Sequence, residues 1–225
     1  MLISVVVVVL IIVLLVFLSN NSKNKKIEND VNKNENVLED KSETLIDGNF
    51  SFLPNESQIK WEGKKTLIKD WVDSGFISLT SGFINTKGGS PVSGNIVMDM
   101  NSIRATKTGA NTGEDKLSTH LKSADFFDVN TFPNSEFKVT KIILNENKTY
   151  QITGDVTIKG ITKSIEFPVA IYSKDNKIFL NGEIFINRTD FNIRYGSKSF
   201  FNDLGDNVID DSFVLKLSLV AEKQS

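Results

Sequence analysis

The chain has 225 residues and a formal net charge of −2, which allows one domain with an ordinary core and a further segment. It lacks the basic excess of a nucleic-acid-binding protein. It has no cysteine and a single histidine, His120, which excludes disulfides, thiolate chemistry and a metal site built from several histidines. No pair of nucleophile and base is visible, so the composition favours a binding protein over an enzyme.

Residues 1–19 are predicted to be a membrane anchor or a signal segment. Leu2 to Leu18 is apolar except for Ser4, and a helix of this length covers about 25 Å, close to the lower limit for crossing a bilayer. No basic residue precedes the run and no small-residue cleavage site follows it, which favours an uncleaved anchor. Lysines at 23, 25 and 26 follow the run, and the positive-inside rule would keep the domain cytoplasmic. A start codon assigned too late would remove this conflict with export.

Residues 20–50 are rich in Asn, Lys, Glu and Asp, and their few apolar residues follow no helical spacing. Low hydrophobicity with mixed charge is typical of a disordered or loosely helical tether. The sequence therefore predicts a polar linker over 20–50 and a folded domain over 51–225.

The domain is predicted to be all-β, because apolar and polar residues alternate along most of it. Short turns between consecutive segments favour an antiparallel meander, and eight such strands can close into a barrel with short helical insertions at 102–125 and 197–206. Glycines at 94, 154 and 182 lie within the apolar sets, where they either leave space inside the barrel or relieve curvature. The predicted strands are Ser57–Gly63, Gly75–Ile84, Val92–Met100, Glu136–Leu144, Tyr150–Ile158, Ile165–Ile171, Ile178–Ile186 and Phe213–Ala221.

Six motifs follow one another along the domain: Ile59–Lys65, His120–Val129, Phe132–Phe137, Val156–Lys163, Asn187–Phe191 and Leu204–Val208. This series resembles the YceI family of lipid- or polyisoprenoid-binding proteins over about residues 51–223. The resemblance implies a lipocalin-like eight-stranded barrel, residence in the periplasm, and a lumen that holds a long isoprenoid chain, often an isoprenoid quinone. The sequence departs from the family in having no histidine within Lys69–Gly75 and in having Asn192 where many members have glycine.

We therefore expect a carrier or store for an apolar isoprenoid lipid, with no catalytic residue, no metal and no cofactor other than a bound isoprenoid lipid or quinone. The barrel would lie in the periplasm, anchored to the inner membrane by the N-terminal helix; a homodimer is left open. The alternative is a membrane-tethered structural or stress-related interaction module with a packed core. The expected ligand-binding residues of the lumen and mouth are Trp61, Ile77, Leu79, Ile96, Met98, Phe126, Phe127, Phe137, Val156, Phe167, Ile184, Arg188, Phe200, Phe201 and Phe213.

Some of these residues carry two interpretations. The pairs Phe126–Phe127 and Phe200–Phe201 either close the mouth of the barrel over a ligand tail or pack in the core. Arg188 either pairs with Asp190 or Asp206 to fix a loop, which we favour, or contacts a ligand head group. For His120 we favour a hydrogen bond that fixes a loop.

Overall fold

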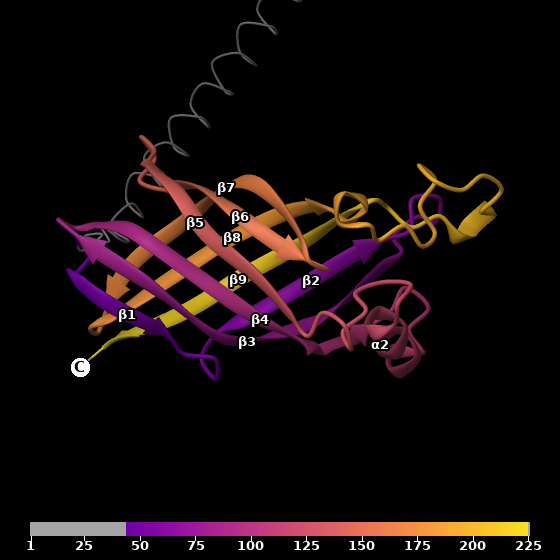
Figure 1. Cartoon of the computed structure of the whole chain (residues 1–225), viewed down its shortest axis with the longest axis horizontal. Coiled ribbons are helices and arrows are strands. Elements are labelled where there is room, and N and C mark those ends of the chain that lie inside the picture. Colours follow the sequence, from indigo (N-terminus) through magenta and orange to yellow (C-terminus); the bar gives the residue numbers. More distant parts are fainter. Residues whose placement is uncertain (1–43, 225) are drawn as a thin grey trace, which may run out of the picture. The chain divides into compact units, whose positions relative to one another are not determined.

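The alternating segments of the sequence form the wall of a closed barrel in the computed structural model, which describes residues 44–224 (Figure 1). The predicted anchor and most of the predicted linker lie outside the described residues. Within 44–224, every helix is too short or too polar to cross a membrane. The strands are β1 (Gly48–Phe52), β2 (Gln58–Lys64), β3 (Val72–Lys87), β4 (Ser90–Lys107), β5 (Asn134–Leu144), β6 (Tyr150–Ile158), β7 (Ile161–Lys174), β8 (Lys177–Asn187) and β9 (Ser212–Lys223).

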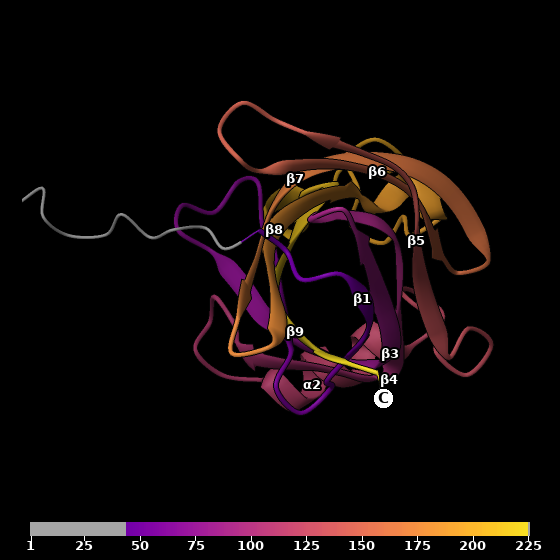
Figure 2. The same ribbon diagram turned by 90° about the vertical axis from the view of Figure 1, so that its left-hand side faces the viewer.

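The sheet is antiparallel throughout and closes through the pairing of β3 with β4. β1 and β2 each pair with both β3 and β9, so these two short strands follow one another in a single position of the wall. The described strands therefore fill eight positions, and the predicted eight-stranded antiparallel barrel is confirmed. Figure 2, turned by 90°, shows the closed wall from one end of the barrel.

Two predicted boundaries are wrong. β1 begins at Gly48, inside the segment predicted to be a linker, because Phe50 is fully buried in the core. β4 continues to Lys107, whereas the sequence predicted a helical insertion from 102. The buried residues of β4 have even numbers from Gly94 to Met100 and odd numbers from Ile103. Because of this break in the alternation, the sequence pattern did not indicate the last part of the strand.

The two ends of the barrel differ. The turns β3–β4, β5–β6 and β7–β8 lie at one end, which we call the hairpin end. The other end, the helix end, carries α2 (Glu114–Lys122), the 3-10 turns η1 (Arg188–Phe191) and η2 (Gly205–Asn207), and the segments around them (Figure 1). The apolar core runs between these ends, where each buried aliphatic or aromatic side chain contributes about 1.5–3 kcal/mol.

Candidate functional site

The hairpin end of the barrel contains an apolar cavity of about 50 Å³. Strands from all sides of the barrel contribute to its lining, because their inward-pointing side chains lie at the same height along the barrel axis. Its main lining residues are Phe52, Ile96, Phe137, Phe167, Val169 and Leu219.

The helix end contains a second cavity, of about 90 Å³. Most of its lining is apolar, and the charged or hydroxyl-bearing lining residues are Lys64, Asp73, Arg188, Asp210 and Ser212. An apolar interior with a few polar groups is typical of sites for amphiphilic small molecules. Its main apolar residues are Trp61, Ile77, Ile103, Phe126, Phe127 and Phe213.

Helix α2 forms one wall of the helix-end cavity through Leu117 and the buried Leu121. Ser118 fixes the helix to β4, because its Oγ accepts a hydrogen bond from the Ala105 backbone N–H at 2.8 Å. In the last turn of the helix, His120 Nε2 lies 3.0 Å from Asp125 Oδ2 in the segment that follows. The predicted loop-fixing hydrogen bond of His120 is therefore confirmed.

His120 also belongs to an aromatic group at the helix end. Its ring meets Phe126 edge-on at 4.9 Å and Tyr195 edge-on at 4.6 Å between centroids. Such edge-to-face pairs contribute about 0.5–1.5 kcal/mol beyond the area that they bury. The group joins the segment after α2 to the segment after η1, two parts of the chain that together cover the cavity.

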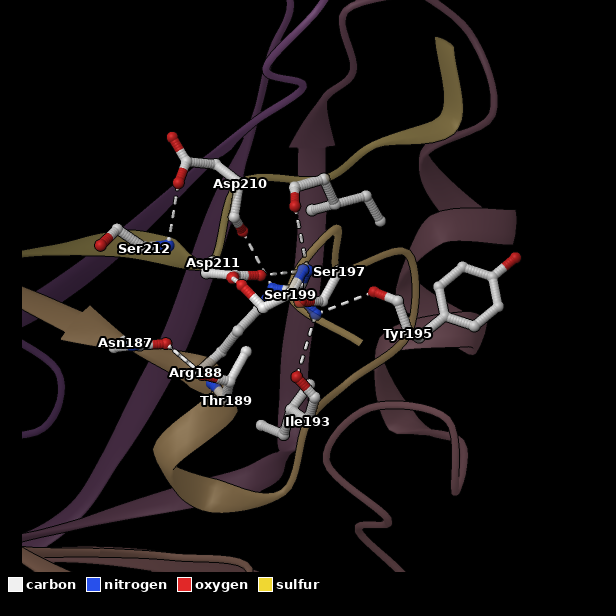
Figure 3. Close-up of polar contacts among 11 residues, drawn as sticks. Asn187, Arg188, Thr189, Ile193, Tyr195, Ser197, Ser199, Asp210, Asp211 and Ser212 are labelled. Atoms are coloured by element: carbon white, nitrogen blue, oxygen red, sulfur yellow. Dashed lines mark hydrogen bonds and ion pairs between the residues drawn. The ribbon is translucent and has the colours of Figure 1, made fainter. Parts of the chain in front are cut away.

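Arg188 fixes the segment after η1 to the segment before β9 (Figure 3). Its guanidinium donates five hydrogen bonds. They run to the carbonyl oxygens of Asp210, Ile193, Tyr195 and Ile209 at 2.8–3.1 Å and to Asp211 Oδ1 at 3.4 Å. Arginine has five N–H donors, so none remains for a ligand head group.

The predicted role of Arg188 in pinning a loop is confirmed, but the predicted partner is wrong. Among the described residues its ion pair is with Asp211, not with Asp190 or Asp206. The side chain is only 4% exposed, and burial lowers its pKa, while Asp211 and then Asp210 act in the opposite direction. The bonds to backbone carbonyls explain why this charge is tolerated away from water.

The expected ligand-binding residues fall into four groups. Phe200 and Phe201 line neither cavity and are 46% and 48% exposed, so the structure does not place them over the mouth. The Phe200 ring instead lies under the Arg194 guanidinium at 4.5 Å. Three of the expected residues line the hairpin-end cavity: Ile96, Phe137 and Phe167. Six line the helix-end cavity: Trp61, Ile77, Phe126, Phe127, Arg188 and Phe213. The remaining four are buried but line neither cavity: Leu79, Met98, Val156 and Ile184.

Several lining residues were not expected from the sequence. Ile103 lies beyond the break in the alternation of β4, and Leu117 and Leu121 lie on α2. The spacing of Leu117 and Leu121 by four residues is the signal of a helix face that could have indicated them. Ile193 follows η1 in an irregular segment and carries no such signal.

No residue lines both cavities, and on β3, β4 and β9 buried side chains lie between those that line one cavity and those that line the other. We call this layer the waist; it consists of the buried residues Ile59, Leu79, Met98, Met100, Val156, Ile184 and Leu215. Each cavity is smaller than the roughly 300–1,000 Å³ of typical small-molecule pockets. The barrel is therefore a largely filled lumen with one apolar cavity toward each end.

The central glycines are part of this filling. A Cβ at Gly154 would collide with the Phe137 ring and lie 2.6 Å from the Lys138 carbonyl oxygen. A Cβ at Gly182 would lie 2.7 Å from Val169 Cγ1. The space that these glycines leave is therefore occupied by neighbouring side chains of the hairpin-end cavity.

The described residues include no group of three or more His, Cys, Asp or Glu side chains that could hold a metal ion. The carboxylates with clearly lowered pKa values, Asp47 and Glu62, are held by hydrogen bonds from backbone amides and from lysines respectively. Neither lines a cavity.

Comparisons with known proteins agree with this architecture. A UPF0312 protein of Pseudomonas putida (strain F1) is 38% identical over 64 residues, covering 28% of this chain and 33% of that protein. A UPF0312 protein of Staphylococcus aureus is 39% identical over 77 residues, covering 32% of this chain and 42% of that protein. The chain thus matches about a third of the length of the first of these curated relatives.

Two solved structures share the fold. BcnA of Burkholderia cenocepacia is 19% identical, with a TM-score of 0.57 over 75% of this chain and 98% of that chain. A polyisoprenoid-binding domain from Saccharophagus degradans, implicated in plant cell wall breakdown, is 18% identical, with a TM-score of 0.57 over 78% of this chain and 98% of that chain. The YceI-like domain profile matches residues 50–221, nearly the whole described barrel. The chain therefore belongs to the family of YceI-like domain proteins.

Proposed function

We propose that the protein binds a long, slim isoprenoid-type lipid, a polyisoprenoid or an isoprenoid quinone, inside the barrel. The observation that carries this proposal is the pair of apolar cavities in line within one closed barrel. A thin chain suits a narrow lumen, and each CH₂-sized unit removed from water contributes roughly 0.8 kcal/mol. The polyisoprenoid-binding domain that shares the fold supports the same class of ligand.

The head group of such a lipid would lie at the helix end, because only that cavity has charged residues in its lining. Arg188 is not the residue that would bind it, since all its donors are used within the protein. Lys64 is exposed and lines the same cavity, and it makes the better candidate contact.

We further propose that the protein is a carrier or store rather than an enzyme, and that it works in the periplasm beside the inner membrane. The apolar run in residues 2–18 supports the membrane location, and the resemblance to the family supports the periplasm. Protease accessibility in spheroplasts tests this location: digestion of the barrel from outside is expected, and full protection would contradict it.

The alternative is a structural module with a filled core, which the small volume of each cavity favours. Lipid extraction and native mass spectrometry of the full-length chain, purified from a host that makes isoprenoid lipids, separate the two functions. Bound isoprenoid lipid near one per chain is expected. Its absence, also after incubation with a polyprenol in detergent, would contradict the proposal.

A matched pair of variants on β7 locates the ligand. Val169 is buried and lines the hairpin-end cavity, whereas its neighbour Ala170 is exposed on the outer face. We expect Val169→Phe to fill the cavity and remove most of the bound lipid, and Ala170→Phe to retain it. Equal retention by both folded variants would place the lipid outside the barrel.

A further inference from the structure

The waist differs from the rest of the core in the kind of side chains that it contains. The chain has three methionines, and the two beyond Met1 are Met98 and Met100, both in the waist. Each is 3% exposed. The other waist residues are branched aliphatic side chains, and Ile and Val have strongly restricted χ1 angles. Methionine is unbranched, has three rotatable side-chain bonds and adapts to changes in packing at small cost.

One of the two register partners of Met98 is a small residue. On β3 its register partner is Leu79, and on β5 its partner is Ser135. Ser135 is 3% exposed, so it is a small side chain at a buried position. A long flexible side chain next to a small one can change its rotamer with little displacement of the wall, whereas the branched side chains around it cannot.

We propose that Met98, supported by Met100, is a movable gate that makes the barrel selective for the chain length of its isoprenoid lipid. This inference rests on the proposed function. A short chain occupies one cavity while the waist stays closed. A long chain displaces the Met98 side chain, passes through the waist and occupies both cavities. The affinity for long chains is reduced by the fraction of molecules in which the waist is closed, whereas the affinity for short chains is not.

Competition between two probes tests the gate. The full-length chain in detergent is equilibrated with farnesol, a short isoprenoid, and octaprenol, a long one, and the bound ratio is measured by extraction and mass spectrometry. Met98→Ala removes most of the gate, so the ratio of octaprenol to farnesol should rise by about fivefold or more. Met98→Leu keeps the volume but adds a branch, so the same ratio should fall by a similar factor.

Ile178→Ala is the matched control, since Ile178 is also fully buried but lines neither cavity and lies outside the waist. It should leave the ratio within about twofold of the wild-type ratio. Thermal unfolding checks that each variant is folded. If Met98→Ala does not fold, the comparison of Met98→Leu with the wild type still tests the gate.

The outcomes separate the gate from the function on which it rests. If both probes bind and the ratio is the same in the wild type, Met98→Ala and Met98→Leu, the gate is wrong and lipid binding stands. An equal rise in Ile178→Ala and Met98→Ala would also overturn the gate, because any truncation in the core would then suffice. If neither probe binds to any folded variant, the proposed function itself fails.

Discussion

The hairpin end and the helix end of the barrel are closed by different kinds of interaction. At the hairpin end, the β3–β4 turn is held by Asp47, whose carboxylate accepts hydrogen bonds from the N–H groups of Gly88 and Gly89 at 2.9 Å each. Both glycines have positive φ, of 61° and 75°, as a tight hairpin turn requires. The turn is therefore held by its backbone geometry and by one exposed carboxylate.

At the helix end, long segments are held by one buried cation. Arg188 joins η1 to residues 193–195 and to residues 209–211, and its guanidinium satisfies four backbone carbonyls. The comparison indicates that damage to the β3–β4 turn stays local, whereas the loops of the helix end depend on a single side chain. The following predictions test this difference, from the largest expected effect to the smallest.

Arg188→Met is expected to lower the free energy of unfolding by about 3–5 kcal/mol, because it leaves several buried carbonyls without donors. Arg188→Lys should recover only part of this loss, since an ammonium group cannot reproduce the planar set of five donors. Urea unfolding monitored by tryptophan fluorescence measures both. Arg194→Met is the control: it removes an exposed guanidinium at the same end, and about 0.5 kcal/mol is expected for its cation–π contact with Phe200. Similar losses in Arg188→Met and Arg194→Met would contradict the central role of Arg188.

Gly154→Ala is expected to destabilise the barrel by about 1–3 kcal/mol, because the new Cβ overlaps the Phe137 ring and the Lys138 carbonyl. Gly63→Ala is matched to it: Gly63 lines the helix-end cavity, no atom outside its chain neighbours lies within 4 Å of a Cβ there, and a small stabilisation of about 0.5 kcal/mol is expected. Thermal unfolding distinguishes them. A neutral Gly154→Ala would mean that the hairpin end has more free volume than its lining indicates.

Glu62 tests the outer wall, away from both cavities. Its carboxylate contacts Lys60 at 2.7 Å and Lys216 at 3.0 Å, and hydrogen bonds from Lys60 and then Lys216 lower its pKa below the ordinary value of 4.5. A pKa that is lower in the folded state adds stability above the unfolded-state pKa, and this stability is lost as the pH falls through the folded pKa. Glu62→Gln should therefore cost about 0.5–1 kcal/mol near neutral pH and almost nothing in strong acid.

Urea unfolding at a series of pH values checks the Glu62 prediction. Glu183→Gln provides the comparison, because Glu183 is 55% exposed and lies 3.9 Å from Lys216. A difference between wild type and Glu62→Gln that stays constant down to strong acid would show that packing, not charge, accounts for it.

Asp47→Ala is expected to have the smallest effect, confined to the hairpin end. The pKa of Asp47 is lowered chiefly by the hydrogen bonds from Gly89 and Gly88. Hydrogen exchange should show faster exchange of these two amides, with the unfolding midpoint unchanged. Glu146→Ala in the β5–β6 turn is the control, since the carboxylate of Glu146 makes no hydrogen bond within the described residues and its loss should alter neither amide. Slower unfolding or exchange changes at α2 would contradict a local role.

The strands were predictable from the sequence because a strand with one buried face has apolar and polar residues in alternation. β6 is the clearest case: Tyr150, Ile152, Gly154, Val156 and Ile158 are all buried and alternate with partly exposed residues. Whether the side chain at such a position points into the barrel is determined by the pleat of its own strand. The same reasoning failed at Ile103, where a register shift in the pairing of β3 with β4 moves the buried set from even to odd positions.

The candidate site was predictable only in part. The sequence indicated the inward-facing residues, but it assigned them to a single lumen, whereas the structure divides them between two cavities and the waist. It also predicted that Phe200 and Phe201 lie at the mouth of the barrel, but both are exposed on the turn after Gly196. Loops of this kind have no periodicity, so their path depends on the partners that they meet.

By itself, the sequence determined the barrel, because alternation along each strand and short turns between strands are local properties. Only the tertiary structure decided that β1 and β2 share one position in the wall, that Asp211 is the partner of Arg188, and that Met98 lies between two cavities. Each of these depends on residues far apart in the chain meeting at one level of the barrel. That level is set by the register and closure of the whole sheet, which no single segment contains.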